Sequence, residues 1–341
     1  MKPTIKDVAE RAKVSPSTVS RVLTGVGYVS AATKEKVLKA VDELGYNPNG
    51  VARSLKRAKT QTIGVIVPDI SNPYFVRVVR SIENCVSKSD YNLLLCSTDD
   101  NASKEETFLR ILRERRIDGL IFAPSRLELG SALKPFLDAN IPVVLVDRTI
   151  TDVEVDTVVE EGEQSSYRLV QSLIEMGHER IAIVNSKPYI STSIERQRGY
   201  ERAMLDAGIP IRPQYIQHGR FDQETGYLCG KRLFTLKDDR PTAIFATNNS
   251  ILYGLMLAAR ELLIRIPEDI SLVSFGDLEY SELIFPRVTA ILQHPDRVGT
   301  TAAEVLLARL NHTHVEEVQK TRRIVLPTDF RCGTSVRNLR D

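Results

Sequence analysis

Small hydroxyl side chains crowd the segment from Ser15 to Ser20, near the start of the 341-residue chain. Four of these six residues are serine or threonine, Pro16 lies among them, and Arg21 follows. Hydroxyl groups on the exposed face of a short helix add little to a protein core, but they hydrogen-bond to phosphate oxygens and base edges. The chemistry that these residues predict is recognition of a nucleic acid.

A second set of polar side chains follows apolar segments farther along the chain. Asp69 and Asn72 come after GVIVP, Asp147 after VVLV, Asn248 after TAIFAT and Asp277 after ISLVSFG. Parallel sheets bring the carboxyl ends of their strands to one edge, and ligands bind there. Polar caps on strand ends would explain any one of these residues alone. Their recurrence favours a cleft for a small polar ligand.

Charge is unevenly divided along the chain. Residues 1–60 hold 12 Lys and Arg against 5 Asp and Glu, whereas the remainder holds 34 against 39. A basic segment of this kind predicts a polyanionic partner, because cationic side chains displace the counterions of a phosphate backbone. A solvated surface is the alternative explanation.

Signals for catalysis and metal binding are weak. The segment 226–231 resembles a phosphate-binding loop, but it is one residue short and lacks the Ser or Thr that would hold magnesium. His312 and His314 have no carboxylates at a metal-ligand spacing. Four scattered cysteines, no apolar run of about 18 residues and no signal segment are typical of a cytoplasmic protein. We therefore expect no enzyme activity, no cofactor and no metal.

Three short helices should position the hydroxyl residues. Thr4 with Asp7 fits a capping box, and Ser15 followed by Pro16 predicts a helix over 16–23. A third helix follows Ser30 and ends at Gly45. Its expected inward positions are Val37, Leu38, Val41 and Leu44. Together these helices predict an all-α helix-turn-helix headpiece over residues 1–46.

A basic linker over residues 47–60 comes next. Val51, Ala52 and Leu55 fall on one face of a possible short helix, and Arg53 lies among the basic residues on the other. A helix this short is marginal alone. We hypothesise that two copies order side by side on DNA and insert Leu55 into the minor groove. A flexible basic tether is the alternative.

From Thr62 onward, apolar runs alternate with amphipathic helical segments. This pattern predicts an α/β core, over residues 61–341, of two lobes with doubly wound parallel sheets. The first lobe should contain about residues 61–160 and 290–321, and the second about residues 161–289 and 322–332.

Blocks of this sequence resemble the LacI/GalR family of transcriptional regulators over almost the full chain. They include IKDVAERAKVSPSTVSRVL, VARSLKRAKTQTIGVIVPDISNPYF, RQRGYERAML and PEDISLVSFGD. The resemblance implies a homodimer on a pseudo-palindromic DNA operator and a core related to periplasmic sugar-binding proteins. It also implies a recognition helix at the hydroxyl-rich segment, a hinge helix with Leu55 as wedge, and a sugar-like effector between the lobes.

The residues and the resemblance together give two sets of candidates. The DNA-binding candidates are Thr4, Ser15, Pro16, Ser17, Thr18, Ser20, Arg21, Asn49, Val51, Ala52, Arg53 and Leu55. The effector-binding candidates are Asp69, Asn72, Tyr74, Phe75, Asp147, Arg196, Phe221, Asn248 and Asp277.

Two departures from the family pattern bear on the effector. Asn249 stands where the family usually has Asp, and so does Gly276. A carboxylate in a closed cleft repels an anion, whereas Arg196 can grip a carboxylate or phosphate in two places. These residues favour a sugar acid, such as a keto-deoxy sugar acid, as effector.

The sequence therefore predicts a transcriptional regulator, most simply a repressor of a carbohydrate or sugar-acid catabolic operon. A cytosolic sugar-binding module and a sugar-processing enzyme of the same architecture are the alternatives. Residues 1–58 disfavour the first, and no activated nucleophile or paired carboxylates support the second. The C-terminal residues contain no leucine heptad, which favours a dimer over a tetramer.

Overall fold

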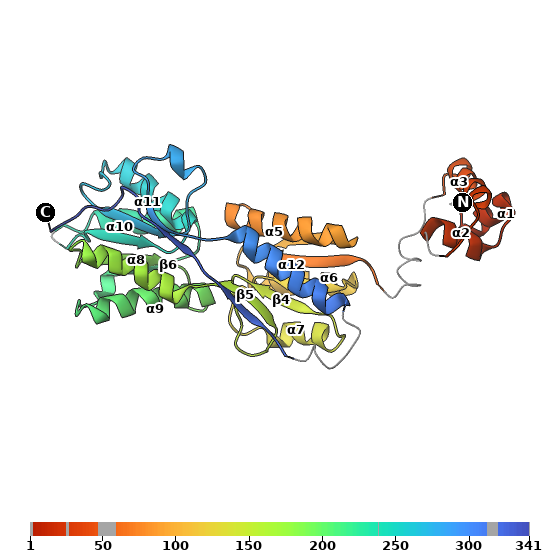
Figure 1. Ribbon diagram of the computed structural model, residues 1–341. Helices are drawn as coiled ribbons and strands as arrows, with labels where there is room; N and C mark the ends of the chain where they lie inside the picture. Colours follow the sequence, from red (N-terminus) through yellow and green to blue (C-terminus); the bar gives the residue numbers. More distant parts are fainter. Residues whose placement is uncertain (1–2, 25–26, 47–58, 238, 312–319, 341) are drawn as a thin grey trace. The chain divides into compact units, whose positions relative to one another are not determined.

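The computed structural model describes residues 3–24, 27–46, 59–237, 239–311 and 320–340. The chain divides into two compact units, Met1–Thr60 and Gln61–Asp341. Figure 1 shows a small helical unit and a larger α/β unit. No helix in these described ranges combines the length and apolar character needed to cross a membrane.

The smaller unit contains three helices: α1 (Ile5–Ala12), α2 (Pro16–Thr24) and α3 (Ala31–Leu44). All three begin where the sequence signals place them. Asp7 accepts a hydrogen bond from the Thr4 backbone N–H at 2.7 Å, and Ser30 accepts one from Thr33 at 3.3 Å. Gly45 ends α3 in the left-handed conformation that its missing Cβ permits. The predicted headpiece is present in the structure.

The headpiece core corrects one expectation about α3. Val37 is fully buried, but the Leu38 side chain is 42% exposed. Successive residues of a helix point about 100° apart, so Val37 and Leu38 cannot both face the same small core. The prediction that Leu38 is buried was wrong.

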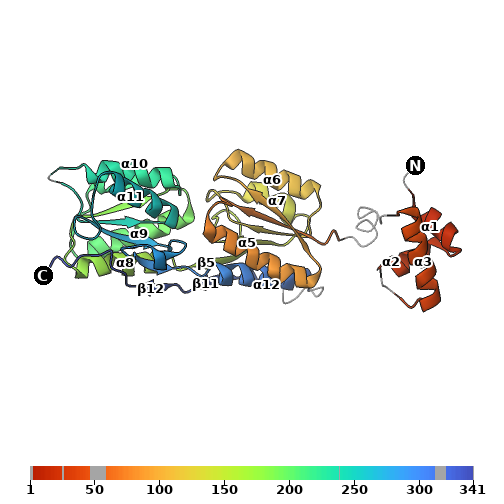
Figure 2. The same cartoon turned by 90° about the horizontal axis from the view of Figure 1, so that it is seen from above.

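The first lobe of the larger unit is a parallel sheet in the order β11-β5-β4-β3-β1-β2. Its strands are β1 (Thr62–Val67), β2 (Asn92–Ser97), β3 (Gly119–Phe122), β4 (Val143–Val146), β5 (Asp156–Glu160) and β11 (Arg323–Leu326). Its helices are α5 (Pro73–Val86), α6 (Ala102–Glu114), α7 (Gly130–Leu137) and α12 (Pro295–Asn311). In Figure 2, α5 and α12 cover one face and α6 and α7 the other. Each face has its own apolar cluster.

The second lobe repeats this plan in the order β12-β10-β9-β8-β6-β7, with β12 antiparallel. Its strands are β6 (Ile181–Asn185), β7 (Ile216–His218), β8 (Ala243–Ala246), β9 (Ser271–Phe275), β10 (Thr289–Leu292) and β12 (Asp329–Arg331). Its helices are α8 (Glu163–Glu175), α9 (Ser191–Asp206), α10 (Gln223–Phe234) and α11 (Asn249–Glu261). Apolar clusters again lie on both faces of the sheet. The predicted fold class, two doubly wound lobes behind a helical headpiece, is confirmed.

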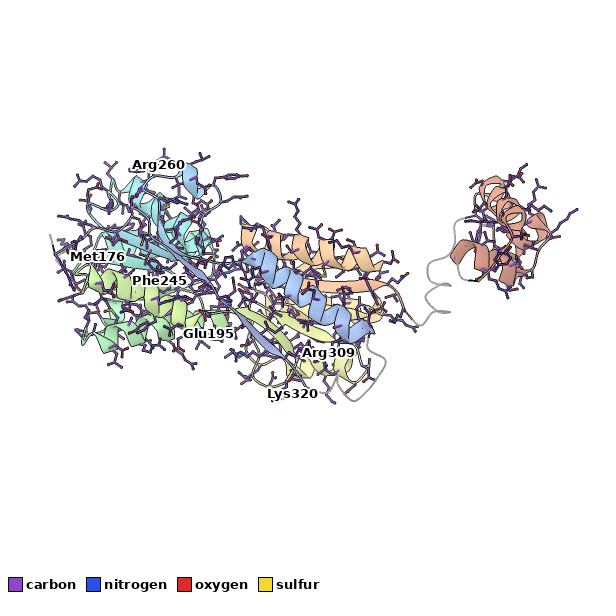
Figure 3. All side chains as sticks on the ribbon, viewed as in Figure 1. Met176, Glu195, Phe245, Arg260, Arg309 and Lys320 are labelled. Carbon is purple, nitrogen blue, oxygen red and sulfur yellow. The ribbon has the colours of Figure 1, made fainter. Side chains whose placement is uncertain are left out.

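The chain crosses between the lobes after β5, after β10 and after β11. The predicted boundaries at 290 and 322 were therefore wrong, because β10 pairs with β9 in the second sheet and β11 pairs with β5 in the first. An apolar run predicts a strand but does not say which sheet edge it joins. Arg309, labelled in Figure 3, fixes the returning α12 to β5 through two bonds to Asp156, at 2.7 and 2.8 Å.

Candidate functional site

A cavity of about 40 Å³ lies between the two lobes, at the carboxyl ends of their strands. Its walls come from loops of both sheets and from the first turns of α5, α9 and α11. The lining residues are Pro68, Asp69, Asn72, Tyr74, Phe75, Asp100, Asp147, Arg148, Thr192, Arg196, Phe221, Asn248, Asn249 and Gln293. We call this cavity and its walls the interlobe cleft.

The structure brings eight of the nine effector-binding candidates together in this cleft, all except Asp277. Five polar lining residues were not among the candidates: Asp100, Arg148, Thr192, Asn249 and Gln293. Some of them carried a signal in the sequence. Arg148 and Asn249 directly follow candidates at strand ends, and Thr192 lies four residues before Arg196, on the same face of α9. Asp100 and Gln293 follow strands that the apolar pattern already marked.

Arg196 is the central cation of the cleft, and its side chain is buried. Nη1 donates to the Thr247 carbonyl oxygen at 2.7 Å, and the guanidinium lies 4.0 Å from the centre of the Phe275 ring. Its Nε atom has no hydrogen-bond partner in the structure. Burial lowers the pKa of Arg196, and the nearby Asp147 opposes that shift. An arginine stays charged even so, so it offers unused donors to an anionic or polar ligand.

Arg148 closes one side of the cleft through an ion pair. Its Nη1 atom lies 2.5 Å from Asp100 Oδ1 and 3.2 Å from the Pro124 carbonyl oxygen. Burial alone would lower the pKa of Arg148, but Asp100, together with Asp147 and Glu105, outweighs it and the pKa is raised. Asp100 also borders a wider cavity of about 680 Å³ between the lobes. The charge of Arg148 is thus already compensated within the protein.

Tyr74 and Asp147 line the cleft, and Glu160 contacts Tyr74 from outside the lining. Tyr74 donates to Glu160 Oε2 at 3.1 Å, and Glu160 also accepts from the His294 backbone N–H and from Gln293. Asp147 lies at a left-handed turn directly after β4, with φ of 62°. Burial raises the pKa of Asp147, although Arg148 and Arg196 oppose that shift. Burial likewise raises the pKa of Glu160.

Asp277 does not line the cleft, so its placement differs from the prediction. Its carboxylate pairs with Arg331 of β12, with Nη2 at 2.6 Å from Oδ1. It also accepts from Ser281 Oγ and from the Leu278 backbone N–H, at 2.7 and 2.8 Å. Gly276, with φ of 90°, turns the chain between β9 and this carboxylate. The role that these contacts support for Asp277 is structural.

We expect Asp277→Asn to lower the free energy of unfolding by about 1–3 kcal/mol, because the mutation removes a charge-assisted pair with Arg331. Burial would raise the pKa of Asp277, but the bonds from Arg331 and Ser281 outweigh it and lower the pKa. The lowered pKa means that the carboxylate stabilises the fold above its unfolded-state pKa of about 4 and loses this effect as the pH falls below it. Thermal unfolding monitored at several pH values measures both effects.

Glu282→Gln provides the control for this prediction. Glu282 carries the same charge five residues away, but its side chain is 77% exposed and 3.9 Å from Arg287, so its loss should change stability little. An Asp277→Asn protein that melts like the wild type while losing its ligand response would contradict the structural role.

The candidate DNA-binding face lies at the start of α2. Ser15 Oγ lies 2.7 Å from Ser17 Oγ and 2.9 Å from Thr18 Oγ1. Ser15, Pro16, Ser17 and Arg21 are exposed, and Thr18 and Ser20 are half-buried. Thr4 is exposed beside Asp7 at the start of α1. The hinge candidates Asn49, Val51, Ala52, Arg53 and Leu55 lie outside the described residues.

Sequence comparison assigns both units to one family. Residues 4–49 match the bacterial regulatory proteins of the lacI family, and residues 60–330 match the periplasmic binding proteins and sugar binding domain of the LacI family. The HTH-type transcriptional repressor PurR of Vibrio vulnificus is 38% identical over 309 residues, covering 90% of this chain and 92% of that protein. The chain belongs to the LacI family.

Solved structures of LacI-family members are similar over the full length. The lac repressor dimer bound to operator and the anti-inducer ONPF is 25% identical, with a TM-score of 0.84, and the match covers 99% of this chain and 100% of that one. A complex of the transcriptional regulator CelR with cellobiose is 26% identical, with a TM-score of 0.71 and coverage of 98% and 99%. Family membership confirms the predictions of a DNA-binding transcriptional repressor and of a chain that is not an enzyme. The roles of individual site residues stay predictions.

Proposed function

We propose that this LacI-family repressor binds a pseudo-palindromic operator as a homodimer and that a small sugar-like molecule in the interlobe cleft controls the binding. The observation that carries the proposal is the pairing of two features. The exposed hydroxyl face of α2 suits the major groove, and a buried arginine with unused donors faces a cavity between two lobes. The lac repressor structure, a dimer on its operator, supports the dimeric form.

Selection of genomic fragments by the purified full-length protein tests this function. We expect preferred fragments with two related half-sites, and an affinity for bulk DNA that falls steeply as the salt concentration rises. Basic residues near the exposed start of α2 would release counterions on binding, whereas a sugar-binding module would show no such slope. Absence of any preferred fragment, with or without small metabolites, would refute the proposal.

We further propose that the effector is a sugar acid and that the repressor controls a catabolic operon. Arg196 Nε and Thr192 Oγ1 are buried and have no hydrogen-bond partner in the structure, so both can serve ligand oxygens. Arg148 already neutralises Asp100, and Asp277 pairs with Arg331 outside the cleft. Asp69 and Asp147 are the remaining carboxylates of the cleft lining. Asp147 lies 3.6 Å from Arg148 Nε, and its raised pKa makes protonation easier.

This charge arrangement predicts that the affinity for a sugar acid rises as the pH falls. An anion beside Asp147 raises its pKa further, so the complex takes up a proton that the free protein lacks. The affinity for the acid should rise by up to about tenfold for each pH unit of decrease, in the pH range where binding takes up one whole proton. Calorimetry from about pH 8 to pH 5 measures it, using whichever of gluconate, galacturonate and 2-keto-3-deoxygluconate stabilises the protein most.

Asp147→Asn is the control for the pH dependence, because it removes the titrating group and should flatten the profile. An affinity that falls with falling pH, or tight binding of neutral glucose or ribose with none of the acids, would contradict the acidic effector.

A further inference from the structure

Two asparagines join the lobes directly at the wall of the cleft. Asn72 is the N-cap of α5 in the first lobe and Asn249 is the first residue of α11 in the second, two helices that Figure 1 shows in different lobes. Asn72 Nδ2 donates to Asn249 Oδ1 at 3.2 Å, and Asn249 Nδ2 donates to Asn72 Oδ1 at 3.1 Å. Both side chains are buried, with 8% and 9% of their surface exposed. Each amide is therefore donor and acceptor to the other across the cleft.

Each amide is also anchored within its own lobe. Asn72 Oδ1 accepts from the Tyr74 backbone N–H at 3.0 Å, which caps α5. Asn249 Oδ1 accepts from the Ser250 backbone N–H at 2.9 Å. Both carbonyl oxygens thus have two protein donors each, the usual capacity of an amide oxygen. The pair is held in place by backbone on both sides, so it senses the distance between the two helix starts.

Among the described residues, other hydrogen bonds also join the lobes, including a longer one from Asn72 Nδ2 to Ser250 Oγ at 3.5 Å. The Thr149 backbone N–H donates to Ser191 Oγ at 2.9 Å, and Arg220 Nη2 donates to the Asp99 carbonyl oxygen at 2.7 Å. The lobes are thus closed on each other by the chain's own groups. A neutral amide pair suits this position, because breaking it leaves no buried charge behind and the lobes can still separate.

We propose that the Asn72–Asn249 pair is a latch that holds the lobes closed without an effector, so that it sets the operator affinity of the effector-free repressor. The regulatory part rests on the proposed function, in which a molecule in the interlobe cleft controls operator binding, and adds that lobe closure couples the two sites. The latch itself is a property of the core. It biases an equilibrium between closed and open lobes that an effector then shifts.

Amide exchange at Thr149 reports closure, because its N–H bonds to the other lobe. Thr151 supplies an internal reference, since its N–H bonds to Leu127 within the first lobe at 2.8 Å. In the effector-free wild type we expect Thr149 to be protected. Asn249→Asp places a carboxylate oxygen against Asn72 Oδ1, so Thr149 should exchange roughly tenfold faster relative to Thr151.

Asn72→Asp is a second variant for the same test. An aspartate still caps α5, so the helix should persist while the donor to Asn249 is lost. Asn101→Asp is the matched control: Asn101 caps α6 by accepting from Ser103 and Lys104 of its own lobe. This variant should exchange like the wild type.

Hydrogen exchange of the full-length protein and a gel shift with selected operator complete the experiment. The proposal is supported if Thr149 exchanges faster in both latch variants and their operator affinity changes at least threefold. The Asn101→Asp variant must match the wild type in both exchange and operator affinity. Equal exchange in all proteins, or an unprotected Thr149 in the wild type, overturns the latch. Faster exchange with unchanged operator affinity overturns its regulatory part. A wild type that binds no operator refutes the proposed function separately, since the exchange measurement needs no DNA.

Discussion

Replacing Arg196 with methionine is expected to weaken binding of a sugar acid at least about 30-fold, because a buried charged hydrogen-bond partner costs about 2–5 kcal/mol when it is removed. Arg196 is the cation of the cleft that no ion pair of the described residues neutralises at short range, whereas Arg148 is paired with Asp100. Its Nε atom is a buried donor without a hydrogen-bond acceptor, as is Nε of Arg148 among the described residues that line the cleft. Methionine keeps an unbranched side chain of similar length, so the apolar contact with Phe275 is partly retained.

Thermal stabilisation by the acid that best stabilises the wild type measures the loss. Arg196→Lys separates charge from geometry, because lysine keeps the charge but cannot hold two oxygens in a fork. It should bind more weakly than the wild type and more tightly than Arg196→Met. A methionine variant that responds to the acid like the wild type would show that the anion is held elsewhere.

Loss of folding is the competing explanation, and a double variant excludes it. Arg196→Met leaves Asp147 buried without one of its two cations, which raises the pKa of Asp147 further. Asp147→Asn removes that unpaired charge, so the double variant should regain thermal stability without regaining acid binding. The operator affinity of the effector-free protein should be retained in each variant, because neither mutation touches the Asn72–Asn249 pair proposed to hold the lobes closed.

Structural features that depend on residues close together in the sequence could be predicted. Thr4, Ser15 and Ser30 mark the helix starts of the headpiece because a capping side chain bonds to backbone only two or three residues away. The carboxyl ends of parallel strands likewise brought Asp69 and Asp147 to one cleft, since that arrangement follows from the strand direction alone.

Features set by distant partners were not predictable. Asp277 follows a strand as Asp147 does, but Arg331, 54 residues away, captures it outside the cleft. The pairing of Asn72 with Asn249 spans 177 positions. The lobe boundaries failed for a related reason, because β11 is a short strand that could extend either sheet and only its pairing with β5 decides. A single sequence does not show which distant residues pair. Asp, Arg and Asn are also common on protein surfaces, so their presence alone does not indicate a partner.

Ser17→Glu is expected to abolish operator binding, with a loss of at least about 100-fold, while leaving the headpiece folded. Ser17 is exposed in the first turn of α2, where a carboxylate favours the helix by interacting with its dipole. The same carboxylate would face DNA phosphates if α2 enters the major groove, and a charge of the wrong sign at an interface costs several kcal/mol. Stability and affinity should therefore move in opposite directions, which a general destabilisation cannot produce.

Leu38→Glu is the matched control within the same headpiece, because Leu38 is 42% exposed on α3 and lies outside the DNA-binding candidates. It adds the same charge to the same 60-residue unit, so it accounts for the long-range repulsion that any added carboxylate would cause. Gel shifts with selected operator, together with thermal unfolding of the full chain, distinguish the two sites. Similar losses of operator affinity in both variants would mean that net charge, rather than contact at the start of α2, governs binding. If the operator affinity of Ser17→Glu were unchanged, the start of α2 would not contact DNA, and the proposed role of its exposed hydroxyl groups would be wrong.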